Sequence, residues 1–239
     1  MKPPTLSIDP NVLHKFPAMT VAAVTATIDD PACLKKLNDK LVSQLTPVVE
    51  RLNTVEPITQ LEEIAQWRQA YGSMSIKPSK FHSSIEALLR RVKKGDDIST
   101  GLPIVDLYNL ISVIHGTPMG AYDLDKLPDA EIVLRLANPA SDNFDPLGGK
   151  ADSYPLNEDL VIYAAGSDVL CWGINTRDSV RSCVDDTSRT IVFMSEASSE
   201  NTSLRPVAAL DMLATELADL GIATSDVMTA SQSVPKIAL

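Results

Sequence analysis

The sequence contains no long hydrophobic run and few cysteines. No stretch reaches the roughly 18 consecutive apolar residues that a membrane helix needs, so no membrane span is predicted. Its start, MKPPTLSIDP, lacks the charged-then-apolar layout of a secretory signal. Cys33, Cys171 and Cys183 are odd in number and lack close paired spacing, which predicts reduced, mostly buried thiols and no structural metal. These absences favour a cytoplasmic protein.

Several motifs of catalysis are also absent. Gly148-Gly149-Lys150 lacks the upstream glycine and the following Ser or Thr of a phosphate-binding loop, which disfavours ATP chemistry. The histidines at 14, 82 and 115 are scattered and form no zinc-binding pattern. No Gly-x-Ser-x-Gly elbow appears, although catalytic triads can assemble from distant positions. We therefore expect neither a cofactor nor a metal.

Positive charge is scarce overall but concentrated in one segment. The net charge of −10 argues against a protein that coats nucleic acid nonspecifically. Between residues 77 and 94, however, a single acid, Glu86, stands among six cations: Lys77, Lys80, Arg90, Arg91, Lys93 and Lys94. This basic segment either binds one localised anionic partner or is a solvated helix end whose cations suit the helix dipole.

The remaining composition is that of a globular protein. The chain has 239 residues, of which 44% are hydrophobic and 22% charged. Residue periodicity predicts helices over 30–52, 58–71, from Ser79 or Ser83 to 94, 104–114 and 205–220, and strands over 20–28, 131–137, 159–164, 168–172 and 190–194. This order predicts one α+β domain with helices packed on a mixed or antiparallel sheet. We place the domain at 1–225, followed by a poorly anchored tail at 226–239 that is a candidate for disorder.

Two polar regions are candidates for a site. The first contains Asp106, Tyr108, Asn109, Gly120, Tyr122 and Asp123. Gly120 either lets a ligand approach the backbone or simply forms a turn. The second, residues 175–179, follows a predicted strand. Its Asn175 and Arg177 can donate to a carbonyl or a phosphate. Its Asp178 can accept from an ammonium group or orient a water, with capping of a turn as the competing role.

Several motifs resemble a known family. The string SSIEALLRRVKKG, followed by VDLYN and PMGAYDLD, is similar to the B3/B4 domain of the phenylalanyl-tRNA synthetase beta subunit, and most closely to its free-standing relatives. The similarity continues into CWGINTRDSVRSCVDDTSRTIVF and is best over residues 77–196. It implies a domain related to the one in which the synthetase hydrolyses tyrosine wrongly attached to phenylalanine tRNA. A free-standing copy would then deacylate a mischarged tRNA in trans.

The resemblance also implies roles for particular residues. Tyr108 and Asn109 fall on a helix that borders the synthetase pocket, and Gly120 falls where the synthetase has a histidine and its free-standing relatives commonly have glycine. In this hypothesis Asn109 and Asp178 act in catalysis, with Asp178 holding the ammonium group or a water. The basic segment steers the acceptor stem of the tRNA. Substrate is bound by the set Tyr108, Gly120, Tyr122, Asn175 and Arg177.

The segment Cys171 to Asp178 departs from the free-standing relatives. Those relatives usually read Cys-Arg-Arg-Trp-Asn-Trp-Arg-Gln, whereas this chain reads Cys-Trp-Gly-Ile-Asn-Thr-Arg-Asp. Two arginines and two tryptophans of that pattern are missing, although Trp172 can partly substitute. Two other functions therefore stay open: a noncatalytic RNA-binding module, and a protein that uses the pocket for a free amino acid or a related metabolite.

Overall fold

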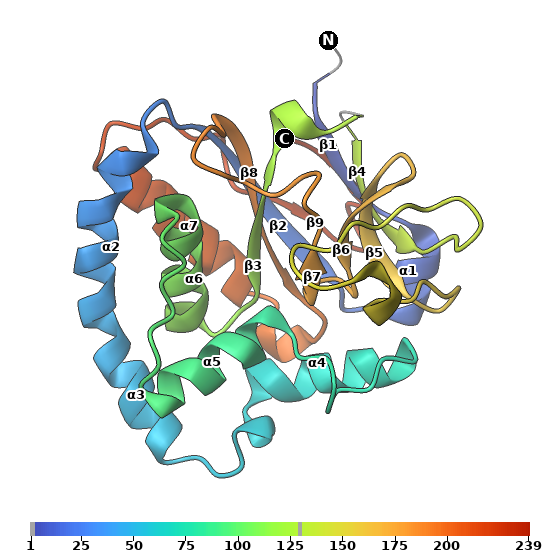
Figure 1. Ribbon diagram of the computed structural model, residues 1–239, viewed down its shortest axis with the longest axis horizontal. Coiled ribbons are helices and arrows are strands. Elements are labelled where there is room, and N and C mark those ends of the chain that lie inside the picture. Colours follow the sequence, from blue (N-terminus) through green and yellow to red (C-terminus); the bar gives the residue numbers. More distant parts are fainter. Residues whose placement is uncertain (1–2, 129–130) are drawn as a thin grey trace.

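The computed structural model describes residues 3–128 and 131–239, which form an α+β structure with two β-sheets (Figure 1). The larger sheet has the strand order β10-β1-β4-β5-β6-β7. Its strands are β1 (Thr5–Ile8), β4 (Glu131–Leu136), β5 (Val161–Ala165), β6 (Asp168–Trp172), β7 (Arg177–Asp178) and β10 (Lys236–Ala238). Strands β1 and β4 are parallel and the other neighbours are antiparallel, so this sheet is mixed.

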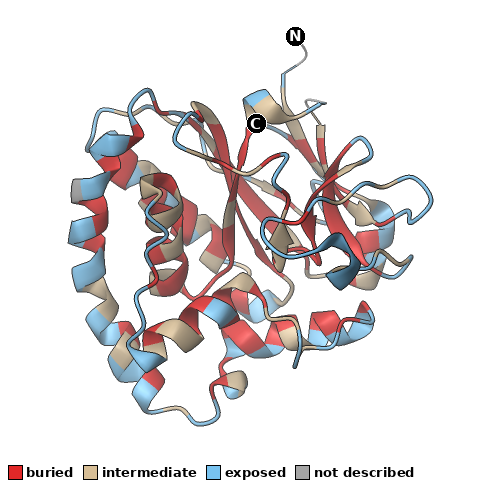
Figure 2. Ribbon diagram, viewed as in Figure 1, coloured by how far each residue is buried: buried red, intermediate tan, exposed pale blue. Residues whose placement is uncertain are grey.

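The smaller sheet is antiparallel and has the order β3-β8-β2-β9. It consists of β2 (Thr20–Thr27), β3 (Met119–Asp123), β8 (Thr190–Ala197) and β9 (Met228–Ala230). Helices α6 (Pro103–His115) and α7 (Arg205–Ala218) pack on it, and α2 (Lys35–Val42) packs on α6 (Figure 1). Buried residues gather on the strands and on the helix sides that face them (Figure 2).

The other helices are α1 (Pro10–Lys15), α3 (Thr46–Asn53), α4 (Glu62–Ser73) and α5 (Ser84–Lys94). Helix α5 shows why the sequence predicts these elements well. The Ser83 side chain accepts a hydrogen bond from the Glu86 amide, and Gly95 ends the helix with φ at +75°, where a glycine is favoured. Its buried side is the expected apolar stripe: Ile85, Leu88, Leu89 and Val92.

The helix predicted over 30–52 is broken into shorter pieces. Short 3-10 turns over 31–34 and 43–45 flank α2, and α3 follows with Pro47 in its first turn. Proline lacks an amide hydrogen and its ring clashes with the carbonyl four residues earlier, so a continuous helix cannot pass through Pro47 unstrained. The apolar periodicity continues across the break because both helices face the same core.

The C-terminal segment, a candidate for disorder from sequence, instead contains two strands. Strand β9 pairs with β2, and β10 pairs with β1 at the register Thr5 to Ala238. Ala230 and Ile237 are buried there. The residues that anchor the segment are more than 200 positions away, which local sequence patterns do not reveal.

Two further sequence expectations can be compared with the structure. Cys171 is buried, but Cys183 is partly exposed and Cys33 is exposed, so only one of the three free thiols matches the expectation of burial. Over the described ranges 3–128 and 131–239, no helix is both long and apolar enough to cross a membrane.

Candidate functional site

A cavity of about 60 Å³ lies between the two sheets, beside β3, β6, β8 and the turn before β7. We call it the inner cavity. It contains five of the residues singled out from sequence: Gly120, Tyr122, Asn175, Arg177 and Asp178. The other lining residues are Ser84, Met119, Tyr163, Cys171, Ile174, Thr176, Met194 and Glu196. The two polar regions of the sequence thus meet in one place.

A tight turn brings Asn175 to this cavity. Gly173 and Ile174 both have positive φ, +67° and +68°, and the backbone N–H of Asn175 donates to the Gly173 carbonyl at 2.8 Å. A β-branched residue such as Ile174 rarely adopts positive φ, and such strain costs about 1–3 kcal/mol. Strained backbone of this kind is concentrated at functional sites, so the turn supports the assignment of a site here.

A directed chain of hydrogen bonds orients the Asn175 amide. The Thr176 hydroxyl donates to the Tyr71 oxygen at 2.7 Å, and Tyr71 donates to Asn175 Oδ1 at 2.6 Å. Asn175 Nδ2 then donates to Glu196 Oε1 at 2.9 Å. Each hydrogen bond in this series is donated in the direction of Glu196. The side-chain amide of Asn175 therefore has its oxygen toward Tyr71 and its N–H groups toward the acid.

Glu196 is the most perturbed acid of the cavity. It is 4% exposed, and among the described residues no Lys, Arg or His lies within ion-pair distance of it. Burial raises the pKa of its carboxyl to about 8, the charge of Asp178 adds to the rise, and the Asn175 hydrogen bond opposes it. At neutral pH the group is mostly protonated and close to its titration point.

Asp178 and Cys171 are neighbours within the cavity. Burial raises the pKa of Asp178, while the Cys171 side chain and the Arg177 charge oppose the rise. Burial also raises the pKa of the Cys171 thiol well above its ordinary value, with the Asp178 charge adding to the effect. Since the thiolate is the nucleophile, Cys171 is unreactive at neutral pH. Acid–base chemistry at Glu196 and Asp178 is the chemistry that this cavity supports.

The inner cavity opens into a larger groove of about 350 Å³, which we call the outer groove. Ser84, Thr176 and Arg177 line both spaces. The other residues of the groove are Lys80, Phe81, His82, Ala87, Ser153 and Tyr154.

Aromatic rings and cations lie together at this groove. The Phe81 and Tyr154 ring centroids are 5.7 Å apart, and each ring has a cation over it. Lys80 Nζ lies 4.9 Å from the Phe81 centroid, and the Arg177 guanidinium lies 5.5 Å from that of Tyr154. Such a surface suits a ligand with both a planar ring and an anionic group.

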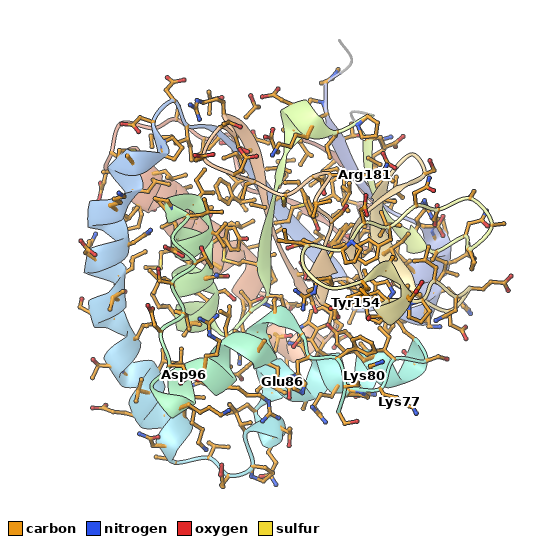
Figure 3. The ribbon with its side chains drawn as sticks, in the orientation of Figure 1. Lys77, Lys80, Glu86, Asp96, Tyr154 and Arg181 are labelled. Atoms are coloured by element: carbon orange, nitrogen blue, oxygen red, sulfur yellow. The ribbon has the colours of Figure 1, made fainter. Side chains whose placement is uncertain are left out.

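The six cations of the basic segment are divided between the two ends of α5. Lys77 and Lys80 precede the helix, and Asp96 lies past its opposite end (Figure 3). Lys80 lines the outer groove together with Tyr154. The other four cations, Arg90, Arg91, Lys93 and Lys94, belong to the final turns of α5. At 1.5 Å per residue, Lys94 is about 15 Å along the axis from Ser84 of the inner cavity.

Three of the distal cations have protein partners. Arg90 binds the buried Glu86, Arg91 donates to the Asp97 carbonyl, and Lys93 binds the Val55 carbonyl and the Glu56 carboxylate. Of the six cations of the basic segment, Lys80 lines the outer groove, and none lines the inner cavity in the described part of the chain.

Tyr108 and Asn109 lie on α6, outside the residues that line the inner cavity in the described part of the chain. Tyr108 is buried and its ring packs edge-on against Phe193 at 6.5 Å. Burial and the charge of Asp178 raise its pKa, so the hydroxyl stays protonated. Asn109 is half-buried.

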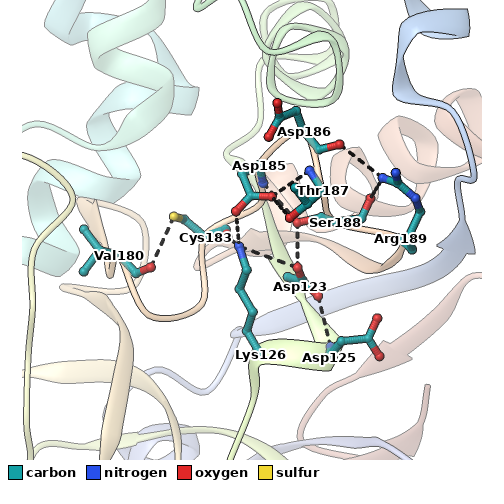
Figure 4. A network of polar contacts seen from close by, with 10 residues as sticks. All are labelled: Asp123, Asp125, Lys126, Val180, Cys183, Asp185, Asp186, Thr187, Ser188 and Arg189. Carbon is teal, nitrogen blue, oxygen red and sulfur yellow. Dashed lines mark hydrogen bonds and ion pairs between the residues drawn. The ribbon is translucent and has the colours of Figure 1, made fainter.

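Asp123 ends β3 in a separate polar network (Figure 4). The Ser188 hydroxyl donates to Asp123 at 2.6 Å, and Lys126 lies 3.6 Å from the same carboxylate. Lys126 also pairs with Asp185, whose pKa is held well below its ordinary value by this bond and by two donors from Thr187. These groups have partners and stabilise the turn over 185–188.

Sequence reasoning missed Glu196, Tyr71 and the aromatic groove. A signal for Glu196 exists: it is an acid in a strand whose residues 191–197 are all buried. Tyr71 is a buried aromatic whose hydroxyl orients Asn175. Within residues 3–128 and 131–239, no group of three or more His, Cys, Asp or Glu side chains is placed to hold a metal.

Comparison with known proteins gives a match to a family model and similarity to solved structures. The family model of the B3/4 domain matches residues 66–212. A crystal structure of an N-terminal fragment of the phenylalanyl-tRNA synthetase beta-subunit from Pyrococcus horikoshii matches with a TM-score of 0.40 and 16% identity. That match covers 53% of this chain and 43% of the fragment. No curated protein matches the chain.

Proposed function

Because the chain belongs to the B3/4 domain family, we propose that it hydrolyses the ester of a mischarged aminoacyl-tRNA in trans. The observation that carries this proposal is the Glu196 carboxyl, which is buried in the inner cavity, has no cation within ion-pair distance among the described residues, and has its pKa raised to about 8. An acid whose pKa is shifted toward the working pH, in a cleft, is typical of acid–base catalysis.

In the proposed reaction a water molecule attacks the carbonyl carbon of the aminoacyl ester. Ionised Glu196 takes a proton from the water as the new C–O bond forms. It returns that proton to the ribose oxygen as the ester C–O bond breaks, which yields the free amino acid and the uncharged tRNA. One N–H of Asn175 binds Glu196, and the other is available for the ester oxygen.

The acids that line the inner cavity suit the positively charged α-ammonium group of the aminoacyl ester. Asp178 lines the same cavity and offers an anion for the α-ammonium group. An arriving ammonium lowers the pKa of both neighbouring acids, because an opposite charge favours the ionised form. Substrate binding therefore helps to generate the ionised Glu196 that the reaction requires.

The size of the inner cavity limits the substrate. Its volume of about 60 Å³ is well below the roughly 300–1,000 Å³ typical of small-molecule sites. The reacting carbonyl, the attacking water and a small side chain fit this space better than an aromatic side chain does. We therefore expect alanine or serine esters to be preferred over tyrosine esters.

The outer groove accommodates the 3′ end of the tRNA in this proposal. The faces of Phe81 and Tyr154 suit the terminal base, and base stacking on an aromatic ring contributes roughly 1–3 kcal/mol. Lys80 and Arg177 suit the terminal phosphate. The groove and the inner cavity share Arg177, so one residue contacts both halves of the substrate.

Binding of a free amino acid or related metabolite in the inner cavity is the second candidate function. The observation that favours it is that Arg90, Arg91 and Lys93, in the final turns of α5, already have protein partners, which leaves fewer free cations for RNA. This function predicts thermal stabilisation by a metabolite and none by tRNA.

The test is a deacylation assay with tRNAs that carry alanine, serine or tyrosine on a non-cognate tRNA, including tyrosine on phenylalanine tRNA. We expect at least one ester, most rapidly a small one, to be hydrolysed faster than in buffer alone. Asn175→Ala and Arg177→Ala should slow the reaction about tenfold or more. Asn109→Ala tests the catalytic role that the resemblance implies for that residue.

Each outcome of the assay separates the candidates. Salt-sensitive tRNA binding without turnover would favour a noncatalytic RNA-binding module. Stabilisation by a free amino acid but not by tRNA would favour the metabolite function. Undiminished hydrolysis in both Asn175→Ala and Arg177→Ala would contradict the assignment of the site.

A further inference from the structure

Tyr163 and Glu196 meet in the inner cavity from different sheets. Both residues line that cavity. Tyr163 belongs to β5, which lies between β4 and β6 in the larger sheet, and Glu196 belongs to β8 of the smaller sheet (Figure 1). Tyr163 is 1% exposed, and its ring centroid lies 6.3 Å from that of Tyr122. The surrounding strands therefore hold the tyrosine ring in a fixed position beside the acid.

The pairing of β5 with β6 is irregular directly after Tyr163. Tyr163 pairs with Cys171, but Ala164 pairs with Val169, so Leu170 of β6 has no counterpart on β5. A bulge of this kind bends the strand and changes the direction of nearby side chains, and bulges are common beside active sites. The irregularity therefore lies where Tyr163 enters the cavity.

The Tyr163 hydroxyl is buried and has no hydrogen-bond partner among the described residues. Such a group is costly, and its presence in a folded protein calls for an explanation. Glu196 supplies one. Burial raises the pKa of the Glu196 carboxyl, and the Tyr163 hydroxyl is close enough to oppose that rise. The two groups are thus in contact, but the contact is not a well-formed hydrogen bond in this state.

A tyrosine hydroxyl suits an acid that gains and loses a proton. Asn175 Nδ2 can only donate to Glu196, whereas the Tyr163 hydroxyl can either donate or accept. It can accept from the neutral carboxylic acid and, after rotation of its hydrogen, donate to the carboxylate. A hydrogen bond to the ionised form is the stronger of the two, so the hydroxyl favours ionisation of Glu196.

Other titratable groups near Glu196 come from four elements of the described chain: Asp178, Cys171, Tyr71 and Tyr122. Burial keeps the pKa of the thiol and of the two hydroxyls well above their ordinary values, so these three groups stay neutral while Glu196 titrates. Burial and the charge of Asp178 raise the pKa of Glu196, whereas the Asn175 amide and the Tyr163 hydroxyl lower it. Loss of the Tyr163 hydroxyl would therefore remove one of the two groups that favour the ionised acid.

We propose that Tyr163 is the positioning residue of Glu196: its hydroxyl donates to the ionised carboxylate and thereby determines the pH range in which the inner cavity is active. Tyr163 acts through Glu196 and does not itself contact the reacting atoms. Together with Asn175 it provides two fixed donors that hold the carboxylate in one orientation. The kinetic consequence rests on the proposed hydrolysis, whereas the contact between the two side chains does not.

The experiment follows the carboxyl carbon of Glu196 by ¹³C NMR between pH 5 and 10, in the full chain without substrate. The label is placed in glutamate alone, so Asp178 gives no signal, and the Glu196 signal is assigned by its loss in Glu196→Gln. Tyr163→Phe should move the midpoint from about 8 to about 9, because the lost hydrogen bond favours the carboxylate about tenfold. Tyr108→Phe removes the hydroxyl of a buried tyrosine outside the inner cavity and should leave the midpoint unchanged.

Deacylation assays measure the consequence for the reaction. At pH 7 the kcat of Tyr163→Phe should be up to about tenfold below that of the wild type, because less Glu196 is ionised. Its KM should stay the same, since Tyr163 does not bind the substrate. With spontaneous hydrolysis subtracted, the rate should approach that of the wild type above pH 9. A variant that is merely misfolded would not recover with pH.

An unchanged Glu196 midpoint in folded Tyr163→Phe would overturn the proposal, as would an equal shift in Tyr108→Phe. If Tyr163→Phe does not fold, judged by circular dichroism, the wild type decides. Its Tyr163 Cζ signal should change with the midpoint of Glu196 and by more than that of Tyr122, and a constant Tyr163 signal would overturn the proposal. A shifted Glu196 midpoint in Tyr163→Phe, with no ester hydrolysed by the wild type, would support the contact and contradict the proposed function instead.

Discussion

Asp123 and Glu196 are acids on the neighbouring strands β3 and β8, and each is 4% exposed. They lie toward opposite ends of the paired region, since Asp123 pairs with Ile191 and Met119 with Ser195. Asp123 accepts from the Ser188 hydroxyl and the Asp125 amide and has Lys126 nearby (Figure 4). Glu196 has the Asn175 amide but no cation within ion-pair distance in the described structure. The two acids are equally buried but differ in their partners. We therefore assign Asp123 a structural role and propose a catalytic role for Glu196.

The largest expected effect is a pH dependence of stability that comes from Glu196. Its pKa is about 8 in the folded protein and near its ordinary 4.5 in the unfolded chain. Between these values the folded state binds the additional proton, so the free energy of unfolding decreases as pH rises and levels off above about 8.

The size of this effect is about 3–5 kcal/mol, because each tenfold change in proton affinity is worth about 1.4 kcal/mol. Urea unfolding from pH 4 to 9 measures it, and Glu196→Gln should remove this contribution. Asp185 acts with the opposite sign, since its pKa is lowered and its contribution is lost only as pH falls below the ordinary 3.8. If the free energy of unfolding had the same pH dependence in the wild type and in Glu196→Gln, the raised pKa of Glu196, and with it the contrast with Asp123, would be contradicted.

Removal of the cation from the Asp123 network should cost stability. Lys126→Met eliminates the contacts to Asp123 and Asp185 and the 2.8 Å bond to the Cys183 carbonyl. We expect a loss of about 2 kcal/mol, typical of hydrogen bonds to charged groups. Chemical denaturation measures it, with Lys150→Met as the control. A loss below about 0.5 kcal/mol, within the range of ordinary surface substitutions, would show that this network does not stabilise the fold.

The two ends of α5 should differ in tRNA binding. Arg177→Ala removes a cation from the mouth of the inner cavity and should weaken binding about tenfold, with a reduced dependence on salt. Arg91→Ala, a matched change at the distal end, should alter affinity less than twofold. Filter binding at several salt concentrations measures both. The reverse result would mean that the final turns of α5 contact tRNA, as the sequence alone predicts.

Gly120→Ala should have the smallest effect on the fold. A Cβ at this position meets no atom within 4 Å, so we expect the free energy of unfolding to change by less than about 0.5 kcal/mol. The added methyl occupies part of the inner cavity and should slow hydrolysis of larger aminoacyl esters most. Thermal unfolding and deacylation rates on the same preparation separate the two effects. Equal rates for all esters would indicate that Gly120 does not border the substrate.

Local patterns in the sequence predict the elements that local interactions form. The cap at Ser83 and the stop at Gly95 define α5, and the Val- and Thr-rich segment 20–28 is confirmed as β2. The resemblance to the B3/B4 domain is confirmed by the family model. Strand β3 is not among the predicted strands, because Gly120 and Ala121 have low strand propensity; pairing with β8 overrides that propensity.

The candidate site was predicted only where its residues are clustered in sequence. Asn175, Arg177 and Asp178 are adjacent, so their polar character stands out. Glu196 becomes significant only because the fold buries it beside Asn175 and Asp178, with no cation within ion-pair distance among the described residues. That environment is a property of the tertiary structure. Asn109 illustrates the converse, since its position beside Tyr108 suggested a pocket residue, but helix α6 places it outside the lining of the inner cavity.

The most direct test of the account is single-turnover deacylation by wild type and Glu196→Gln between pH 6 and 9, with spontaneous hydrolysis subtracted. General acid–base catalysis contributes roughly 100-fold or more, so we predict a loss of that size in Glu196→Gln. The wild-type rate should rise with an apparent pKa at or below about 8, because bound ammonium lowers the value of the free protein. Equal rates for the two proteins across this range would contradict the claim that Glu196 is the catalytic acid–base group.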